Sequence, residues 1–558
     1  MGTFDDILVQ IGQFGRYQIM LSFLLCASFI STGWHTVSIV FIGAHRDHWC
    51  RVPGLEGLNE TQRRSLVEPA YCGPNIKEDV CRQCYRNVLN ISSISLLELT
   101  SWNTSGPLNA SREIEKCDSW EYSSTEFTST LLNQYDLVCD RDWLTSMLQT
   151  IYMAGYLVGC LFFGTISDRY GRLTAFLIAL GLELVIAVSE IYIPFYSMFA
   201  VFRFLLGATA GAAYTCAYVY VLELTGPRYR AVIGVFGQWG FDVGVFLSVA
   251  VGYTVKDHIN MQWIFAVPPV IFLVAKLLVP ESPRWLVTKG RFEEAEVFLR
   301  KVAKINRRQF PENTKLESFI DHSANDDEKA TSALDLFRTP NMRRRSLVSF
   351  YVWFSASAVY YGLMLGDRGF GFSIYANVAQ SGAAAILAYF VCVILYNKIG
   401  RRLGIMSMSV TAGVCIFICI PLLNMKHLYP LLFTVSFLGK IANCAGFHGA
   451  YLHSSEYYPT VVRNVGVGCG SMFARVGGLV APQLVRLAIV WQPLPAIILG
   501  VVAITAGLSN LLLPETLNKK LPETIEDGEN FGTKKQKDED ANTEMLNYSP
   551  ASNGTQKA

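Results

Sequence analysis

The amino-acid sequence predicts an all-α membrane protein with twelve transmembrane helices in two six-helix halves. Hydrophobic residues make up 51% of the 558-residue chain and charged residues only 16%, and the mean hydropathy is +0.30. The charges are grouped between apolar stretches, whereas in a soluble chain of this length they would be spread along the sequence. A short motif also recurs at matched places in the two halves. The net charge of +2 gives no indication of nucleic-acid binding.

Apolar windows of about 20 residues, the length that crosses roughly 30 Å of hydrocarbon, supply the twelve predicted helices. Those of the first half lie at 17–42, 143–166, 173–192, 196–222, 230–253 and 261–280. Those of the second half lie at 346–366, 372–396, 404–423, 429–453, 463–489 and 493–513. No small-residue cleavage site stands out after the first window, so we interpret it as a retained helix and not as a signal peptide.

The repeated motif reads GTISDRYGR from Gly164 to Arg172 and VILYNKIGRR from Val393 to Arg402. Gly171 and Gly400 are 229 residues apart, and each copy ends an apolar window. This pattern indicates a duplicated membrane domain. Repeated halves in such proteins place the substrate site between them, where one half moves against the other.

Basic residues in alternate connectors give the orientation. The connectors after spans 2, 4 and 8 carry Arg169 and Arg172, Arg228 and Arg230, and Lys398, Arg401 and Arg402. The connector between spans 6 and 7 is also basic, and the intervening connectors carry little basic charge. The positive-inside rule therefore predicts that both termini are cytoplasmic.

The connector at 44–142 is unusually long and is predicted to be extracellular. Its six cysteines, an even number outside the cell, predict three disulfides whose pairing stays open: Cys50, Cys72, Cys81, Cys84, Cys117 and Cys139. Its four glycosylation acceptors are Asn59, Asn90, Asn103 and Asn109. One CxxC, without a second CxxC or a matching His pair, gives no reason to predict a metal site.

The remaining boundaries follow from composition. We expect an N-terminal half at 1–280, a cytoplasmic linker at 281–345, a C-terminal half at 346–515 and a largely disordered cytoplasmic tail at 516–558. Within the linker, Phe292 to Ile305 predicts an amphipathic helix whose apolar face holds Ala295, Val297, Phe298, Val302 and Ala303. No GxxxxGK[ST], HExxH or GxSxG motif occurs, which argues against an enzyme, an ATP-driven pump or a bound cofactor.

The repeated motif resembles the loops between helices 2 and 3 and between helices 8 and 9 of the major facilitator superfamily. Four further segments resemble the organic cation, carnitine and organic anion transporters of solute carrier family 22: STLLNQYDLVCDRDW at 129–143, PESPRWL at 280–286, SEYYPTVVRN at 455–464 and PETLNKKLPET at 514–524. The resemblance runs from about Phe4 to Thr524 and implies the major facilitator fold. Sugar porters share a PESPRWL-like element but lack the long first loop, so they are a minor alternative.

The resemblance implies alternating access, with the repeated motif at the cytoplasmic gate. The gating residues would be Asp168, Arg169, Arg172 and Glu223 in the first half and Asn397, Arg401, Arg402 and Glu456 in the second. Ion pairs such as Arg172 with Glu223 would form and break as the gate moves. Asn397 stands where the first copy has Asp168, which predicts a weaker or differently partnered second side. The alternative is that these charges only fix topology.

Charges inside predicted spans are costly in hydrocarbon and therefore mark candidate sites. Arg475 is the sharpest case. At this position the resembling family separates cation transporters, which carry Asp, from anion and carnitine-type members, which carry Arg. A guanidinium binds carboxylate or sulfate through two hydrogen bonds. The alternative is an internal salt bridge from Arg475 to Asp242 or Glu183. We also expect a structural ion pair of Glu183 with Arg203 between helices 3 and 4.

A zwitterionic substrate would bind both a cationic residue such as Arg475 and a cage of aromatic side chains. The resemblance aligns Trp353, Tyr360, Tyr361 and Phe447 with pocket positions of the family. Further candidates for the cage are Tyr214, Tyr218 and Trp239. Such faces bind quaternary ammonium groups. We further expect Asp242 to face a cationic group, Lys440 to balance an anion or pair with Asp242, and His448 to form a pocket wall.

Together these features predict a polyspecific plasma-membrane transporter of small organic ions that favours carnitine-like zwitterions or organic anions. The main alternative is an organic cation transporter. A sugar-porter-like carrier and a transport-inactive, receptor-like relative are minor alternatives. The lipid bilayer is the other expected partner, and the sequence does not decide between sodium, proton and exchanged-anion coupling, or uniport, or define an oligomeric state.

Overall fold

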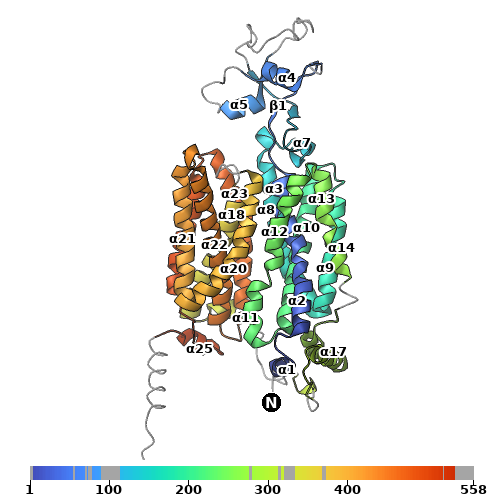
Figure 1. The fold of residues 1–558 in the computed structure, drawn as a ribbon, viewed down its shortest axis with the longest axis vertical. Coiled ribbons are helices and arrows are strands. Elements are labelled where there is room, and N and C mark those ends of the chain that lie inside the picture. Colours follow the sequence, from blue (N-terminus) through green and yellow to red (C-terminus); the bar gives the residue numbers. More distant parts are fainter. Residues whose placement is uncertain are drawn as a thin grey trace, which may run out of the picture.

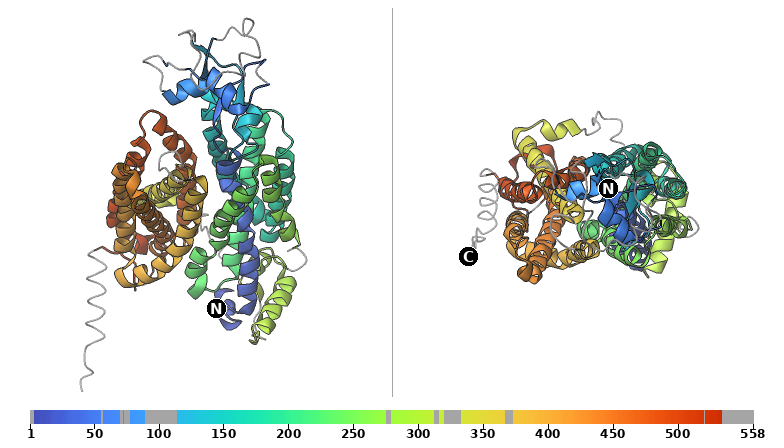
Figure 2. Two further views of the ribbon diagram at one scale, coloured as in Figure 1. Left: turned by 45° about the horizontal axis from the view of Figure 1, so that its top comes forward. Right: turned by 90° about the horizontal axis from the view of Figure 1, so that it is seen from above.

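The computed structural model describes residues 4–54, 57–69, 72, 78–88, 114–274, 279–311, 316–319, 333–366, 373–519 and 521–533. Within these residues eleven helical spans are long and apolar enough to cross a membrane, and a twelfth, His258–Leu273, is shorter. The helices form two bundles that lie side by side (Figures 1 and 2). We call the end of the bundles that carries the cysteine-rich domain the outer end and the opposite end the inner end.

The first bundle holds the six predicted spans of the N-terminal half, with three of them broken. Its helices are α2 (Arg16–Ala27), α3 (Phe29–Ile42), α8 (Trp143–Tyr170), α9 (Arg172–Glu190), α10 (Tyr196–Leu224), α11 (Pro227–Phe236), α12 (Trp239–Thr254), α13 (His258–Ala266) and α14 (Pro268–Leu273). The breaks fall at Ser28, at Gly237 and Gln238, and at Val267 before two prolines. Proline lacks the N–H of an unbroken helix, which explains the last break.

The second bundle repeats the same order, and each of its six spans has one main helix. They are α18 (Pro340–Leu365), α20 (Ile374–Ile399), α21 (Arg401–Leu422), α22 (Tyr429–Tyr457), α23 (Arg463–Arg486) and α24 (Leu494–Ser509). Short 3₁₀ turns η6 (Lys426–Leu428), η7 (Leu487–Ile489) and η8 (Asn510–Leu512) lie at helix ends. Proline near the first turn starts α18, α22 and α24, where its missing N–H costs no helical hydrogen bond.

The outer domain is small and is held by disulfides. It contains β1 (His48–Cys50) paired antiparallel with β4 (Trp120–Tyr122), and β2 (Tyr85–Asn87) paired antiparallel with β3 (Ile114–Lys116). The short helices α4 (Glu60–Val67), α5 (Glu78–Cys84) and α7 (Leu131–Tyr135) and the turn η2 (Cys139–Arg141) complete it. Figure 1 shows it projecting beyond the ends of the membrane helices.

The expectation of three disulfides is confirmed. The pairs are Cys50–Cys117, Cys72–Cys81 and Cys84–Cys139. The two cysteines of the CxxC thus bond to different partners, so neither is free to ligate zinc. Asn59 caps α4 by accepting a hydrogen bond from Gln62 N–H (2.8 Å). The acceptors Asn90, Asn103 and Asn109 lie outside the described residues.

The linker carries the predicted amphipathic helix with one error in its face. α17 (Phe292–Ile305) has the expected bounds, but Val297 is 70% exposed and Leu299 is fully buried in its place. At 3.6 residues per turn Leu299 follows Ala295 by one turn, whereas Val297 lies on the far side. The helices α1 (Phe4–Gln10) and α16 (Pro283–Thr288) and the turns η3 (Leu316–Phe319) and η5 (Ala333–Phe337) accompany it.

The first part of the expected disordered tail is ordered. α25 (Ile525–Asn530) lies against the inner end of α18, where Glu529 accepts hydrogen bonds from the backbone N–H groups of Asn341 (3.0 Å) and Met342 (3.1 Å). Phe531 is buried beside it, and Arg345 donates to its carbonyl (2.7 Å). A carboxylate at the exposed N–H groups of a helix start is stabilising, so this segment belongs to the folded inner surface. Residues 534–558 lie outside the described part.

Candidate functional site

Arg475 lies on α23 where the second bundle faces the first. Its guanidinium carbon is 4.5 Å from the ring centre of Tyr156 on α8 and 6.0 Å from that of Tyr214 on α10. One terminal nitrogen is 3.5 Å from the Tyr156 hydroxyl, and the buried Nε has no hydrogen-bond partner among the described residues. No described carboxylate lies within 4.0 Å. The proposed internal salt bridge to Asp242 or Glu183 is therefore wrong.

Asp242 provides the opposite charge from the first bundle. It is 6% exposed on α12 and accepts a 2.6 Å hydrogen bond from the Tyr389 hydroxyl on α20. No Lys, Arg or His nitrogen of the described residues lies within 4.0 Å of it. A buried carboxylate held by one phenol keeps capacity to accept further hydrogen bonds. At the centre of the interface, the described residues thus supply an anion without a cationic partner from the first half and a cation without an anionic partner from the second.

Tyrosines occupy the space around these two charges. Tyr214 stacks on Tyr218 (6.1 Å between ring centres), and Tyr360 meets Tyr361 edge to face (5.1 Å). His448 stacks on Tyr389 at 4.4 Å, in keeping with a pocket wall. We define the tyrosine cluster as Tyr156, Tyr214, Tyr218, Tyr360, Tyr361 and Tyr389. It joins both halves and presents rings of the kind that bind organic cations.

Two of the aromatic candidates from the second half lie deeper within their own bundle. Trp353 is fully buried, donates its indole N–H to Ser454 (3.0 Å) and packs against Tyr451 at 4.1 Å. Phe447 meets it edge to face at 5.8 Å. Trp239 stacks on the exposed Phe23 instead of facing the tyrosine cluster. Trp353 therefore has no open face in this conformation, while a role in another conformation stays a prediction.

Three further intramembrane charges have internal partners that differ from the expected ones. Lys440 donates to the side-chain oxygen (2.6 Å) and the carbonyl (2.9 Å) of Asn377, not to Asp242. Arg203 pairs with Glu190 at 3.6 Å. Glu183 instead accepts from Ser31 at 2.6 Å. Each of these groups is held by a partner inside its own bundle, so at the central level of the interface Arg475 and Asp242 are the described charges without an oppositely charged partner.

The repeated motif builds a charged network at the inner end of the first bundle. Arg172 lies 2.9 Å from Glu223 of α10 and also pairs with Asp168 one turn earlier. Glu281 accepts hydrogen bonds from the N–H groups of Leu173 (2.8 Å) and Thr174 (3.2 Å), the start of α9. The expected Arg172–Glu223 pair is thus present.

A matching network lies in the second bundle. Arg401 lies 2.9 Å from Glu456 of α22. Glu515 accepts from the N–H groups of Arg401 (2.9 Å) and Arg402 (3.0 Å), the start of α21. Arg402 also donates to the carbonyl of Leu511. Asn397 and Arg169 are exposed. The second half thus has an Arg–Glu pair at the equivalent place and lacks the Asp168 contact. Arg401 contacts both oxygens of Glu456 through Nε (3.0 Å) and a terminal nitrogen (2.9 Å), whereas Arg172 contacts Glu223 through Nε.

Glycine is required at the centre of both networks. Gly171 and Gly400 have φ of +110° and +94°, values that side chains rarely adopt. A Cβ would also lie 2.4 Å from Glu281 at the first glycine and 2.6 Å from Glu515 at the second. The glycines of the repeated motif therefore allow each glutamate to reach the helix start.

Glu515 lies beyond the last membrane helix, and its environment favours the ionised form. Burial alone would raise the pKa of its carboxyl group, but backbone N–H groups of Leu517, Arg401, Arg402 and Thr516 bond to the carboxylate. The net effect is a pKa below the ordinary value.

Hydrogen bonds between the two bundles occur at the outer and central levels of the described structure. At the outer level Thr150 donates to the carbonyl of Leu479 (3.2 Å), Gln483 donates to Thr150 (3.1 Å), and Lys256 donates to Tyr375 (2.8 Å). At the central level Tyr389 donates to Asp242 (2.6 Å) and Arg475 donates to the Tyr156 hydroxyl (3.5 Å). Both inner networks, in contrast, lie within one bundle each, so their opening and closing as a gate stays a prediction.

Comparison with known proteins identifies the family. Residues 102–527 match the family model described as sugar (and other) transporter. The chain is 36% identical over 542 residues to the organic cation transporter protein of Drosophila melanogaster, covering 95% of each chain. It is 33% identical to solute carrier family 22 member 3 of Mus musculus, covering 96% of this chain and 97% of that one. The chain belongs to solute carrier family 22 of the major facilitator superfamily. The human organic cation/carnitine transporter 2 is 30% identical, with 94% of each chain covered.

Solved structures support the fold of this solute carrier family 22 chain. The inward-open xylose transporter XylE from E. coli matches with a TM-score of 0.57 at 15% identity, covering 92% of this chain and 99% of that one. XylE bound to 6-bromo-6-deoxy-D-glucose matches with a TM-score of 0.55. At this identity the match shows the fold alone. The expected major facilitator fold is confirmed, and the relatives are transporters and not enzymes.

Some residues of these sites were missed by reasoning from sequence. Glu281 and Glu515 follow a proline in the segments PES and PET, 234 residues apart, close to the spacing of the repeated motif. That spacing could have identified them as equivalent. Tyr156, in contrast, carries no sequence signal because its contact with Arg475 joins helices from opposite halves.

Proposed function

We propose that the chain is a polyspecific plasma-membrane transporter of small organic ions that works by alternating access, with both termini in the cytoplasm. It favours carnitine-like zwitterions or organic anions. The observation that carries this proposal is the pair of unpaired, opposite charges, Arg475 and Asp242, between the two bundles.

The physical reason lies in the cost of burying charge. A guanidinium without a carboxylate partner in a membrane protein is costly unless a ligand supplies the anion. A substrate carboxylate would bind Arg475 through two parallel hydrogen bonds. A quaternary ammonium would lie against the tyrosine cluster with Asp242 nearby, an attraction worth about 0.5 to 2 kcal/mol per favourable ring. One zwitterion satisfies both sites.

An organic cation transporter is the second candidate. It is favoured by Asp242, by the tyrosine cluster and by the relatives from Drosophila melanogaster that are named for organic cations. In that case Arg475 would be a structural charge held over Tyr156. A sugar-porter-like carrier or a transport-inactive, receptor-like relative would leave both charges without a ligand.

Uptake into cells that express the chain tests the proposal. Labelled carnitine, an aryl carboxylate, urate and tetraethylammonium would be compared with and without sodium at clamped pH, which also separates sodium, proton and exchange coupling. We expect saturable uptake of carnitine or of an organic anion. Uptake of tetraethylammonium alone would favour the second candidate. No saturable uptake of any compound, with normal surface expression, would contradict the transporter proposal.

A further inference from the structure

A separate pocket lies at the outer end of the interface between the bundles. Its volume is about 170 Å³, and its walls come from α3, α8, α18, α23 and α24. Apolar side chains such as Val40, Leu365 and Ile489 form much of the lining. A small ligand in the pocket would therefore contact both halves of the molecule.

The hydrogen bond from Thr150 of α8 to Leu479 of α23 lies between this pocket and the tyrosine cluster. On α8 the lining residues Ser146 and Gln149 precede Thr150, whereas Tyr156 follows it. On α23 the lining residue Arg486 follows Leu479, the acceptor of the Thr150 hydroxyl. The order along both helices places the pocket on the outer side of that contact.

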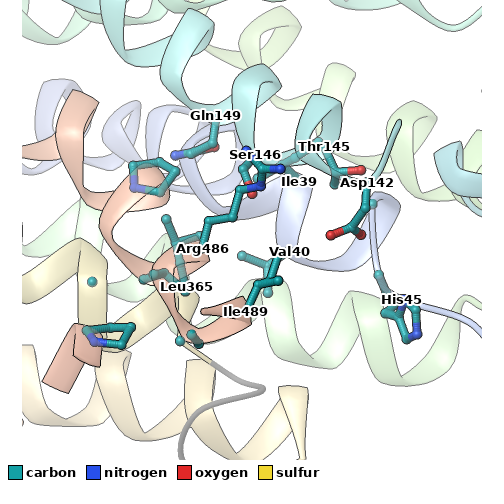
Figure 3. A pocket seen from close by; sticks show the side chains of 18 of the residues that line it. Ile39, Val40, His45, Asp142, Thr145, Ser146, Gln149, Leu365, Arg486 and Ile489 are labelled. Carbon is teal, nitrogen blue, oxygen red and sulfur yellow. The ribbon is translucent and has the colours of Figure 1, made fainter. Parts of the chain in front are cut away.

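Arg486 brings an unpaired positive charge to the pocket. No described carboxylate lies within 4.0 Å of it, and it makes no hydrogen bond within the described residues. It follows Arg475 by eleven residues, which is close to three helical turns or roughly 16 Å along the axis. Both guanidiniums therefore leave α23 on the side that faces α8. Figure 3 shows Arg486 reaching across the pocket towards Ser146, with Gln149, Asp142 and His45 around it.

Two further polar atoms of the pocket are available for hydrogen bonds. Gln149 is 2% exposed and donates its amide N–H to the carbonyl of Thr36 (3.1 Å), while its Oε1 accepts no hydrogen bond from the described residues. The buried Thr145 hydroxyl also has no partner among the described residues. A buried carbonyl oxygen without a donor is costly, and a ligand N–H or O–H would satisfy it.

We propose that this pocket is an outer binding site for small carboxylates that also carry a hydrogen-bond donor and an apolar body. Arg486 binds the carboxylate, Gln149 accepts from the donor, and the apolar walls cover the rest of the ligand. Asp142 at the same pocket disfavours ligands that are purely anionic and supports the requirement for a donor. The site lies beyond the transport site of the proposed function and does not depend on which ion is carried.

The test uses purified full-length protein, so neither transport nor orientation in a membrane is needed. In a Ser146→Cys variant, mass spectrometry measures the rate at which a methanethiosulfonate reagent modifies position 146, and the wild-type protein gives the background. The probe is mandelate, which joins a phenyl ring, a hydroxyl group and a carboxylate. We expect mandelate to slow the modification and to protect better than phenylacetate, which lacks the hydroxyl, or 1-phenyl-1,2-ethanediol, which lacks the carboxylate.

Variants assign the protection to the residues. Added to Ser146→Cys, Arg486→Gln should raise the protecting concentration of mandelate roughly tenfold or more, because it removes a charge-assisted bond. Arg486→Lys should have a smaller effect, and Arg475→Gln none. Absence of protection, protection that survives Arg486→Gln, or protection lost in Arg475→Gln would each overturn the proposal. A folded, monodisperse sample of every variant excludes misfolding as the cause.

Discussion

The inner networks recur in both halves of the duplicated chain, whereas the two halves supply different groups to the central site. At the inner ends, Arg172 with Glu223 and Arg401 with Glu456 form pairs of equal length, 2.9 Å, within their own bundles. At the centre, the first half supplies a carboxylate and the second half a guanidinium. The duplicated part is thus alike in both halves, and the part between them is not.

This difference separates two physical tasks. A network inside one bundle stabilises that bundle, so both halves can use the same arrangement of charged residues. A substrate with distinct chemical groups, in contrast, needs different partners on its two sides. The residues that break the repeat, Asp242 and Arg475, are therefore the ones we expect to contact the transported ion.

The largest expected effect comes from reversing the charge at the centre. Arg475→Asp should lower the transport efficiency for carnitine and for aryl carboxylates by roughly 100-fold, because it places a buried anion beside the substrate carboxylate. Arg475→Lys keeps the charge without the paired hydrogen bonds and should lose less. Uptake is normalised to surface protein measured by biotinylation. Unchanged uptake of both compounds by Arg475→Asp would rule out the role given to Arg475.

Matched changes in the inner networks test whether the two halves are equivalent. Glu456→Gln should lower the free energy of unfolding by about 2 kcal/mol, since it leaves the half-buried Arg401 without a carboxylate. Glu223→Gln should have a smaller effect, because Arg172 keeps its contact with Asp168. Thermal unfolding of the purified variants measures this. An effect of Glu223→Gln as large as that of Glu456→Gln would show that Asp168 does not compensate for the lost carboxylate.

Neutralising the central carboxylate should separate substrates by their positive group. Asp242→Asn should reduce uptake of carnitine about tenfold, the loss of one ionic contact, and leave uptake of an aryl carboxylate close to normal. Tyr389→Phe, which removes the donor to Asp242 but keeps the ring, is the control. An equal loss for both compounds would mean that Asp242 supports the fold instead of binding the ammonium group.

The smallest effect concerns acid sensitivity at Glu515. Its pKa is lowered in the folded protein, so its contribution to stability is complete above the ordinary value of 4.5 and is lost as the pH falls further through the folded-state pKa. Glu515→Gln should therefore unfold more easily near neutral pH, and its difference from the wild type should shrink below pH 4.5. Thermal unfolding at several pH values measures this. A constant difference at all of them would contradict the assignment.

The predictions that succeeded from sequence rest on local or repeated signals. Apolar windows gave the membrane helices, and the even set of cysteines gave three disulfides. The repeat predicted that Arg172 would meet Glu223 because helix ends in one bundle are close. The sequence did not show which helices face each other. The expected pair of Glu183 with Arg203 is absent, and so is the pair with Asp242, one of the two alternatives for Lys440. The predicted apolar face of α17 was wrong at Val297, because the buried residue is Leu299, two positions later.

The sequence by itself determined the membrane class, the two halves, the outer domain and the family, because hydropathy, charge placement and motifs are properties of the chain. Only the tertiary structure decided which charges are paired. Arg475 and Asp242 lie 233 residues apart on opposite halves, and whether they meet depends on how two bundles pack. That packing leaves one charge over Tyr156 and the other beside Tyr389. The candidate substrate site is thus a product of packing between the halves.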